Sequence, residues 1–329
     1  MTVLQDLIAP ETAGDPMSEQ KWVRSSLRQL STRLKNAGHP ASPPTVGRLL
    51  NGLGYALHVN AKKLEASAAH PDRNDQFEHI GLQRQAYGAA GLPIISVDTK
   101  KKELIGNFKN AGQAWGQEAE AVNGHDFLHD AAGRAVPYGI YDLTHNRGSV
   151  YVGTSADTPQ FAVDAIARWW ENSGRSAFPQ ADQLLILADA GGSNGCRPRL
   201  WKQQVQAQLS DRFGLTVTVC HYPTGCSKWN PIEHRLFSHI SINWAGKPLR
   251  SWDTLLAYLR GTTTSTGLEV QAFLQEGVYT TGQSVSEADM QTLNLERHAI
   301  CPYWNYTIRP HPGSSASLDA LLANREVVF

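Results

Sequence analysis

Two short runs of the sequence consist almost wholly of apolar residues, and an aspartate follows each of them directly. Residues 94–97 (IISV) lead into Asp98, and residues 184–188 (LLILA) lead into Asp189. A strand with apolar residues on both of its faces is typical of a sheet that helices cover on both sides. Segments with helical spacing, such as 158–171, separate such runs. The pattern therefore predicts an α/β fold.

The order of the other predicted elements adds detail to this sheet. Strands are predicted at 136–143 and 149–153, joined by a turn at 144–148, and a further strand at 215–219. Helices are predicted at 199–213 and 231–243. The order is thus three strands, helix, strand, helix, strand, helix. We expect a mixed sheet flanked by helices, with an antiparallel hairpin near its start.

The aspartates that follow the apolar strands are candidate functional residues. Open α/β sheets gather their functional groups at the carboxyl ends of strands, so Asp98 and Asp189 are predicted to share a site. Carboxylates in such a group suit Mg²⁺, which prefers oxygen ligands. A purely structural role is the alternative for Asp189, because a turn signal, Gly191-Gly192, follows it. Asp142 is a rival first acid, since it also ends a predicted strand, but the turn after it gives it a structural explanation.

A third candidate acid, Glu233, lies in the segment S-K-W-N-P-I-E at 227–233. Asn230 is a good helix N-cap, Pro231 suits the first helical position, and Glu233 follows the cap by three residues. This is the spacing of a capping box, so helix capping alone would explain Glu233. Capping and metal binding can coexist in principle.

Charge is distributed unevenly along the first sixty residues. Residues 1–20 contain four acidic residues and no Lys or Arg, whereas residues 21–63 contain no acidic residue and eight basic ones: Lys21, Arg24, Arg28, Arg33, Lys35, Arg48, Lys62 and Lys63. Such a run is either a solvated basic face or the electrostatic footprint of a polyanion partner.

Helix signals in the basic segment favour the polyanion. A first helix is predicted from an N-cap at Ser18, with apolar spacing that includes Trp22, and it ends at Gly38. A second short helix follows the cap and prolines at 42–44 and covers 45–50. Two helices joined by a short turn form a helix-turn-helix unit, and residues 64–92 are predicted to form a connecting helix.

In a helix-turn-helix unit, the start of the second helix faces the major groove of DNA. Thr45 and Arg48 are therefore predicted to read bases, and Lys62 and Lys63 to neutralise phosphates. Lys100, Lys101 and Lys102 follow Asp98, and Lys228 and Arg235 flank Glu233, so these are predicted to hold the DNA backbone. Trp229 is the best candidate for contacting a base. An exposed charged hairpin is the alternative for the three lysines.

Composition excludes several classes of protein. The formal net charge is zero, and no apolar run approaches the ~18 residues of a membrane span. The start of the chain lacks the pattern of a secretory signal, and the four cysteines form no disulfide framework or zinc pattern. We therefore expect a cytoplasmic protein with no membrane partner.

Longer motifs around the acids resemble a known family. The two main motifs are A-D-A-G-G-S-N-G at 188–195 and S-K-W-N-P-I-E-H-R-L-F-S at 227–238. Further stretches are V-D-T-K-K-K-E at 97–103, P-Y-G-I-Y-D-L at 137–143 and W-N-Y-T-I at 304–308. Together they resemble the ISAzo-type insertion-sequence transposases, the Rhodopirellula-type DDE transposase group, distant relatives of the Tc-mariner superfamily. The resemblance covers nearly the whole chain from about residue 8.

The resemblance implies a ribonuclease-H-like core with Asp98, Asp189 and Glu233 as the catalytic triad and metal ligands. It implies two Mg²⁺ ions, which Mn²⁺ can replace, with Asp98 shared between them. The reaction would be cleavage of DNA at the element's ends and transfer of the freed strand into target DNA. Such enzymes commonly act as homo-oligomers on DNA.

The expected organisation has four parts: an acidic segment at 1–20, the helix-turn-helix region and connecting helix at 21–92, the catalytic domain at 93–250, and a C-terminal extension of unknown role at 251–329. Relative to the family, the chain begins near an interior position, so a shortened copy is expected. The alternatives to a working transposase are a truncated or domesticated remnant that only binds DNA, and a different nuclease on the same core.

Overall fold

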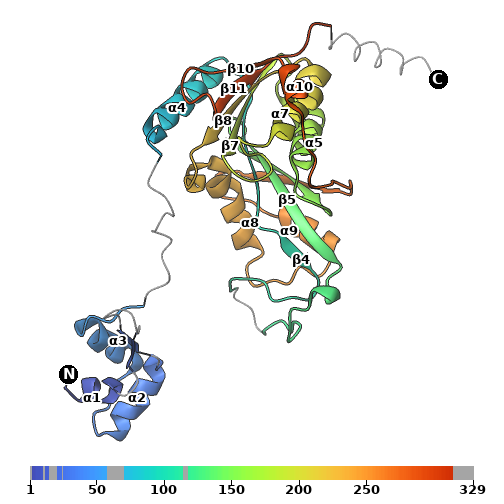
Figure 1. Cartoon of the computed structure of the whole chain (residues 1–329). Helices are drawn as coiled ribbons and strands as arrows, with labels where there is room; N and C mark the ends of the chain where they lie inside the picture. Colours follow the sequence, from blue (N-terminus) through green and yellow to red (C-terminus); the bar gives the residue numbers. More distant parts are fainter. Residues whose placement is uncertain are drawn as a thin grey trace. The chain divides into compact units, whose positions relative to one another are not determined.

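The computed structural model describes residues 2–9, 12–14, 21–23, 25–57, 70–113 and 118–313, and the predicted phosphate contacts Lys62 and Lys63 lie outside them. The chain divides into two compact units, Met1–Ala66 and Ser67–Phe329, which Figure 1 shows as a small helical body and a large sheet-containing body. Within the described residues, no helix is both long and apolar enough to cross a bilayer.

The described residues of the first unit form three helices and a two-stranded hairpin. The helices are α1 (Thr2–Ile8), α2 (Leu27–Asn36) and α3 (Pro43–Gly52), and the strands are β1 (Thr12–Gly14) and β2 (Lys21–Val23). The helices enclose a small apolar core of Leu4, Ile8, Leu30, Leu34 and Val46. The helix-turn-helix arrangement predicted from the sequence is thus present in α2 and α3, and α3 begins at the predicted cap, Ser42.

The predicted start of the first helix is wrong. Residue 18 lies outside the described residues, Trp22 lies in β2, and α2 begins only after Ser26. Ser26 and Gln29 form a capping box: the Ser26 Oγ accepts from the Gln29 backbone N–H at 3.3 Å, and the Gln29 Oε1 accepts from the Ser26 N–H at 2.8 Å. This local pair defines the helix start more strongly than the apolar spacing that suggested an earlier one.

The second unit is built on one mixed sheet. Its centre is β3 (Ile94–Thr99), with the antiparallel strands β5 (Gly133–Asp142) and β6 (Arg147–Gly153) on one side. On the other side lie β7 (Gln183–Asp189) and β8 (Thr216–Tyr222), both parallel to β3. An antiparallel meander followed by two parallel strands on the far side of the first strand is the ribonuclease-H-like arrangement, so the expected fold class is confirmed.

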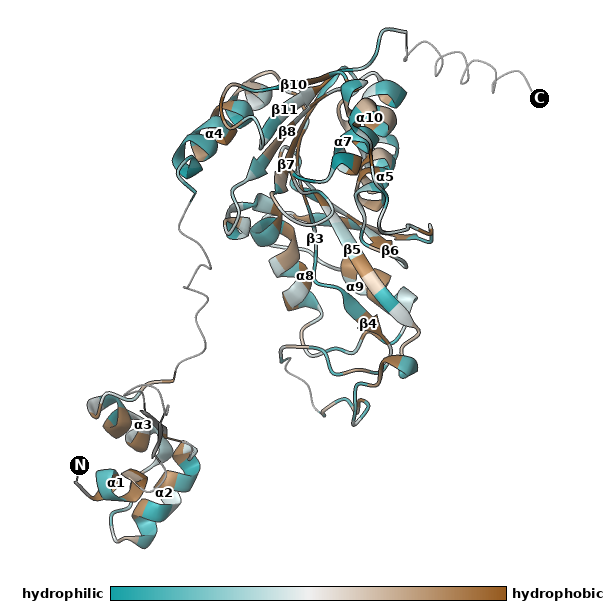
Figure 2. Ribbon diagram, viewed as in Figure 1, coloured by the Kyte–Doolittle hydropathy of each residue, from teal (hydrophilic) through white to brown (hydrophobic). Residues whose placement is uncertain are grey.

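Helices cover both faces of this sheet. On one face lie α5 (Pro159–Trp169) and α7 (Arg199–Val205), and α7 continues as a π-helical segment, Gln206–Asp211. On the other face, α4 (Arg73–Ala89) packs on β3, β7 and β8. α4, expected to connect two domains, is therefore part of the sheet-containing unit. Figure 2 shows hydrophobic residues along the central strands β7 and β8.

The C-terminal residues complete the sheet at both of its edges. β9 (Glu269–Gln275) pairs in parallel with β6, whereas β11 (Asn305–Ile308) pairs with β8 and carries β10 (Leu295–Arg297) outside it. This gives a structural role to the extension whose role could not be predicted. The smaller elements are β4 (Glu103–Ile105), which pairs with β5, α6 (Arg175–Ala177), α8 (Ser238–Asn243), α9 (Trp252–Arg260), α10 (Glu287–Gln291), a π-helical turn at Trp170–Gly174 and 3₁₀ turns at Leu128–Asp130 and Ser227–Trp229.

Candidate active site

Asp98 and Asp189 lie side by side because their strands are parallel neighbours in register. Val97 of β3 pairs with Ala188 of β7, so the next residue on each strand is an aspartate. The backbone N–H of Thr99 donates to the Asp98 Oδ1 at 2.8 Å. The sequence-based expectation that these acids share one edge of the sheet therefore agrees with the geometry.

Asn230 ties the third motif to both aspartate strands. Its side chain is fully buried, and its Nδ2 donates to the Asp189 Oδ1 at 3.1 Å and to the Val97 carbonyl oxygen at 3.2 Å. Its Oδ1 accepts a hydrogen bond from the Ser96 hydroxyl, which is also buried. Asn230 thus fixes the orientation of the Asp189 carboxylate, a role that the sequence patterns did not indicate.

The capping box expected between Asn230 and Glu233 is absent from the structure. The Asn230 backbone N–H donates instead to the Ser227 carbonyl at 2.9 Å. Its side chain is hydrogen-bonded to β3 and β7. The hydroxyl of Ser96, on β3, accepts from the Ile232 backbone N–H at 3.0 Å. The start of this helical segment is therefore held by the sheet, and the Glu233 carboxylate is not used as a cap.

Glu233 opens a π-helical turn, Glu233–Phe237, that packs closely against the sheet. Glycines on β5 and β6 allow this approach: a Cβ at Gly139 would lie 2.9 Å from the Ile232 Cδ1, and one at Gly148 would lie 2.5 Å from the Leu236 Cδ1. π-helical turns in proteins often occur at functional sites. The arrangement brings the Glu233 carboxylate near the two aspartates.

Electrostatics show that the three acids share one site. Burial and the neighbouring Asp189 carboxylate raise the pKa of Asp98 to about 8, and Glu233 adds to the rise. Burial raises the pKa of Asp189 to about 6, although the hydrogen bond from Asn230 lowers it. Burial also raises the pKa of Glu233, which Lys100 partly offsets. Bringing carboxylates together where they are partly buried costs free energy. Raised carboxyl pKa values of this kind are typical of catalytic sites.

Two further aspartates near strand ends have different roles. Asp142, the rival first acid, pairs with Ile95 at the opposite end of β3 from Asp98. Its carboxylate accepts from the backbone N–H groups of Thr144 and His145, which is a turn-stabilising role. Asp157 precedes α5 and contributes to the raised pKa of Asp98. Sequence reasoning missed Asp157, since its neighbours indicate only a turn before a helix.

The lysines after Asp98 have separate surroundings. Lys100 is partly buried, its Nζ lies 5.0 Å from the centre of the Trp244 ring, and burial lowers its pKa. Lys101 lies 4.0 Å from a Glu103 carboxylate oxygen, and Lys102 lies 3.4 Å from an Asp157 one. Of the three, Lys100 is the one whose charge acts on Glu233.

The predicted contacts around Glu233 lie on the surface. Trp229 is 53% exposed, its ring packs edge-on against Phe77, and the Lys228 Nζ lies 5.8 Å from its centre. Arg235 is exposed. In the first unit, Thr45 stands at the start of α3, and the exposed Arg48 donates to its Oγ1 at 3.4 Å.

The chemistry of these acids fits a hard divalent cation. In the described parts of the chain, no three or more His, Cys, Asp or Glu side chains lie close enough together to hold a metal ion as they stand. However, Asp98, Asp189 and Glu233 offer oxygen donors whose mutual repulsion a cation would relieve. The donor set therefore fits Mg²⁺ or Mn²⁺.

A ribonuclease-H-like sheet with three acids at the ends of its central elements defines a class of enzymes that act on nucleic-acid phosphodiesters. Residues 3–310 match the model of a family described as the Rhodopirellula transposase DDE domain. The chain belongs to this family and is a DDE transposase, as the sequence motifs implied.

Among solved structures, the chain is similar to complexes of the Mos1 transposase. The paired-end complex with the left transposon end shares 12% identity, with 78% of this chain and 69% of that chain covered and a TM-score of 0.41. The strand transfer complex shares 12% identity over 78% and 68%, with a TM-score of 0.42. The mariner paired-end complex with Mn shares 13% over 78% and 69%, with a TM-score of 0.41. No curated protein matches the sequence.

Proposed function

We propose that Asp98, Asp189 and Glu233 are the catalytic carboxylates of an insertion-sequence transposase that cuts DNA at the element's ends and joins the freed ends to target DNA. One observation carries the proposal: at the ends of two parallel strands, the Asp189 and Glu233 carboxylates raise the pKa of Asp98, and the Glu233 carboxylate raises that of Asp189. A structural role does not require such repulsion.

The reaction is two successive displacements at phosphorus. In the first, a water oxygen bonds to phosphorus, the bond from phosphorus to the 3′ oxygen breaks, and the water's proton ends on the freed 3′-hydroxyl. In the second, this 3′-hydroxyl attacks a phosphodiester of target DNA and releases a target 3′-hydroxyl. Divalent ions, when bound, activate the attacking oxygen and stabilise the leaving one.

The chain's own residues would prepare this reaction. Asp98, Asp189 and Glu233 would hold the two Mg²⁺ or Mn²⁺ ions. Asn230 orients Asp189 through its Nδ2, and Ser96 holds both Asn230 and the helical segment of Glu233. The charge of Lys100 beside Glu233 would attract a DNA phosphate.

Other predicted residues would bind DNA away from the reacting phosphorus. Thr45 and Arg48 of α3 would read bases, supported by the two-helix arrangement and the exposure of Arg48. Lys62, Lys63, Lys101, Lys102, Lys228 and Arg235 would contact phosphates, and Trp229 would contact a base. Pairing two element ends would require a homo-oligomer on DNA, which is the assembly that we propose.

A nicking assay on supercoiled plasmid DNA tests the proposal. We expect the wild-type chain to nick with Mg²⁺ or Mn²⁺ and to lose this activity with EDTA. Asp189→Asn should reduce the rate by two orders of magnitude or more, because one metal-binding carboxylate is lost. Asp182→Asn is the matched control, since Asp182 is an exposed acid immediately before the same strand. It should retain the wild-type rate.

Two results would contradict this assignment. Equal nicking by Asp189→Asn and wild type would show that the carboxylate is not catalytic. DNA binding without nicking in any metal would instead indicate a remnant that only binds DNA.

A further inference from the structure

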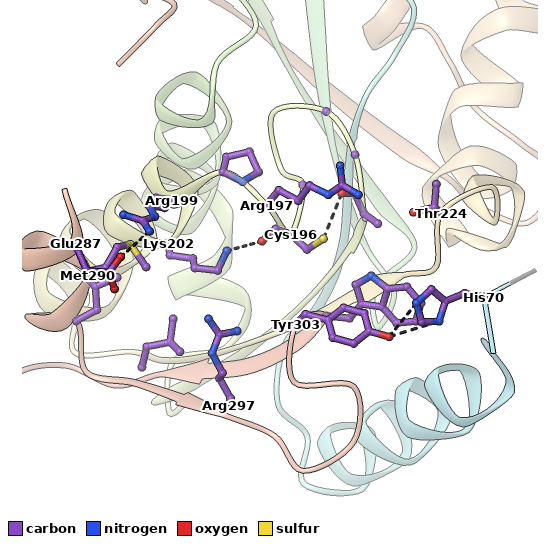
Figure 3. A pocket seen from close by; sticks show the side chains of 18 of the residues that line it. His70, Cys196, Arg197, Arg199, Lys202, Thr224, Glu287, Met290, Arg297 and Tyr303 are labelled. Atoms are coloured by element: carbon purple, nitrogen blue, oxygen red, sulfur yellow. Dashed lines mark hydrogen bonds and ion pairs between the residues drawn. The ribbon is translucent and has the colours of Figure 1, made fainter. Parts of the chain in front are cut away.

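A large cavity lies directly beside the catalytic strand β7, outside the carboxylate site. Its volume is about 1020 Å³, and the loop after Asp189 forms one wall. The other walls come from α7, from β10 and from the segment that precedes β11, and His70 closes one side. Figure 3 shows that side chains from these separate segments surround the same space.

The charged groups that line the cavity are mainly cationic. Arg197, Arg199, Lys202 and Arg297 all line it, and Glu287 is the single carboxylate among the lining residues. The Arg199 Nη2 pairs with the Glu287 Oε2 at 2.6 Å, so that negative charge is already neutralised. Among the described residues, neither Arg197 nor Arg297 forms an ion pair; both are exposed, and Arg297 donates a hydrogen bond to the Pro302 carbonyl at 2.9 Å. The net excess charge of the cavity is therefore positive.

Lys202 is the least expected of these cations because it is 4% exposed. Its Nζ donates to the Cys196 carbonyl and lies 5.3 Å from the centre of the Tyr306 ring, but no carboxylate of the described residues pairs with it. Burial lowers the pKa of Lys202 to about 8. A buried ammonium without a counter-anion destabilises the fold, which suggests that a ligand supplies the anion.

Aromatic rings form the side of the cavity opposite the loop residues. Tyr303 is 38% exposed, and its ring lies 4.7 Å from that of Trp304, centre to centre. The exposed His70 ring lies 4.7 Å from the ring of the buried Trp304 and 5.6 Å from the Tyr303 ring, so the three rings form one cluster. Exposed aromatic faces beside cations are typical of surfaces that hold single-stranded nucleic acid, in which bases stack and phosphates are paired.

We propose that this cavity binds the DNA strand that continues from the reacting phosphodiester, with Arg197, Lys202 and Arg297 holding its backbone phosphates. The inference rests on the proposed function, which places the reacting phosphorus at Asp189. The cavity wall begins one residue later, at Ala190, so a strand leaving the carboxylates meets this space next. A polymer with both phosphates and bases fits the combined cationic and aromatic lining better than a lone anion does.

The test is the salt dependence of DNA binding by the full chain in EDTA, measured on a duplex with a single-stranded 3′ overhang. Each lost phosphate contact reduces the slope of log K against log salt by about 0.7 to 0.9. We expect the double variant Arg197→Gln/Arg297→Gln to lower the slope by about 1 to 2 and to weaken binding at low salt. Both residues are exposed, so the fold should be retained. Arg175→Gln is the matched control, an exposed arginine of α6 that does not line the cavity.

Lys202→Met adds a second readout, in which thermal stability and DNA affinity should change in opposite directions. Removing a buried charge should raise the Tm of the DNA-free chain, whereas DNA affinity should fall. A fall in affinity together with a lower Tm would contradict the anion-binding role of Lys202.

The same slope for the double variant, Arg175→Gln and wild type would overturn the inference. The nicking assay separates this failure from failure of the proposed function. If wild type nicks with metal and the double variant binds like the control, only the cavity assignment fails. If Asp189→Asn nicks like wild type, the carboxylate assignment fails, and so does the inference that depends on it.

Discussion

At the scale of single residues, the hydrogen bond from Asn230 orients the Asp189 carboxylate. Asn230→Ala removes the donor that lowers the pKa of Asp189, so this pKa should rise above about 6. A carboxylate with a higher pKa is protonated over a wider range, and the pH midpoint of metal-dependent nicking should therefore move upward. Losing the buried hydrogen bonds should also cost about 1–3 kcal/mol of unfolding free energy. pH–rate profiles and denaturant titrations measure the two effects.

The isosteric variant Asn230→Asp distinguishes orientation from packing. It keeps the volume but places a carboxylate against Asp189, so the upward shift of the pH midpoint should be larger than in Asn230→Ala. A pH profile that is unchanged in both variants would contradict the positioning role.

At the scale of elements, the close fit of the Glu233 segment on β5 depends on Gly139. A Cβ at this position would lie 2.7 Å from the Phe237 Cζ, and both Phe237 and Ile232 are buried. Gly139→Ala should therefore push this segment away from the sheet, with a cost of about 1–3 kcal/mol in unfolding free energy. Nicking should fall as well, because Glu233 moves with the segment.

Gly88→Ala on α4 is the matched control for this overpacking. A Cβ at Gly88 meets nothing within 4 Å, and the residue is helical. Alanine there should leave the stability unchanged or raise it by up to about 1 kcal/mol. Equal thermal stability and equal nicking for the two variants would show that the close contact at Gly139 limits neither stability nor activity.

Elements that depend on local signals were predictable from the sequence. The strands before Asp98 and Asp189 follow from apolar runs, and α3 follows from Ser42 and two prolines. The link between Ser96 and Asn230 was not predictable, because these residues are separated by 134 positions and only the folded sheet brings them together. The edge strands β9 and β11 were missed for the same reason, since their pairing partners are remote in sequence.

At the scale of the whole molecule, the proposed base reading and the proposed chemistry belong to separate units. The first unit has its own core, and Arg48 is exposed on it. Arg48→Ala should weaken binding to the element's end by about 1–3 kcal/mol. The nicking rate at saturating plasmid should stay unchanged, because none of the proposed catalytic carboxylates is affected. Titration by fluorescence anisotropy and the nicking assay measure these quantities separately.

Arg168→Ala is the control for the loss of one positive charge. Arg168 lies on α5 of the second unit, where it pairs with Asp164 at 3.4 Å. Its removal should leave DNA binding nearly unchanged. An equal loss of affinity in the two variants would indicate that net charge, not α3, determines binding.

The use of C-terminal residues at both sheet edges has a consequence for biosynthesis. Asp98, Asp189 and Glu233 are all synthesised before β9 and β11, and until those strands are made β6 and β8 are open edges. A nascent chain that stopped short of Asn305 would contain all three proposed catalytic carboxylates but an unfinished sheet with an aggregation-prone edge. Synthesis through β11 is therefore needed before the β8 edge of the sheet can be covered.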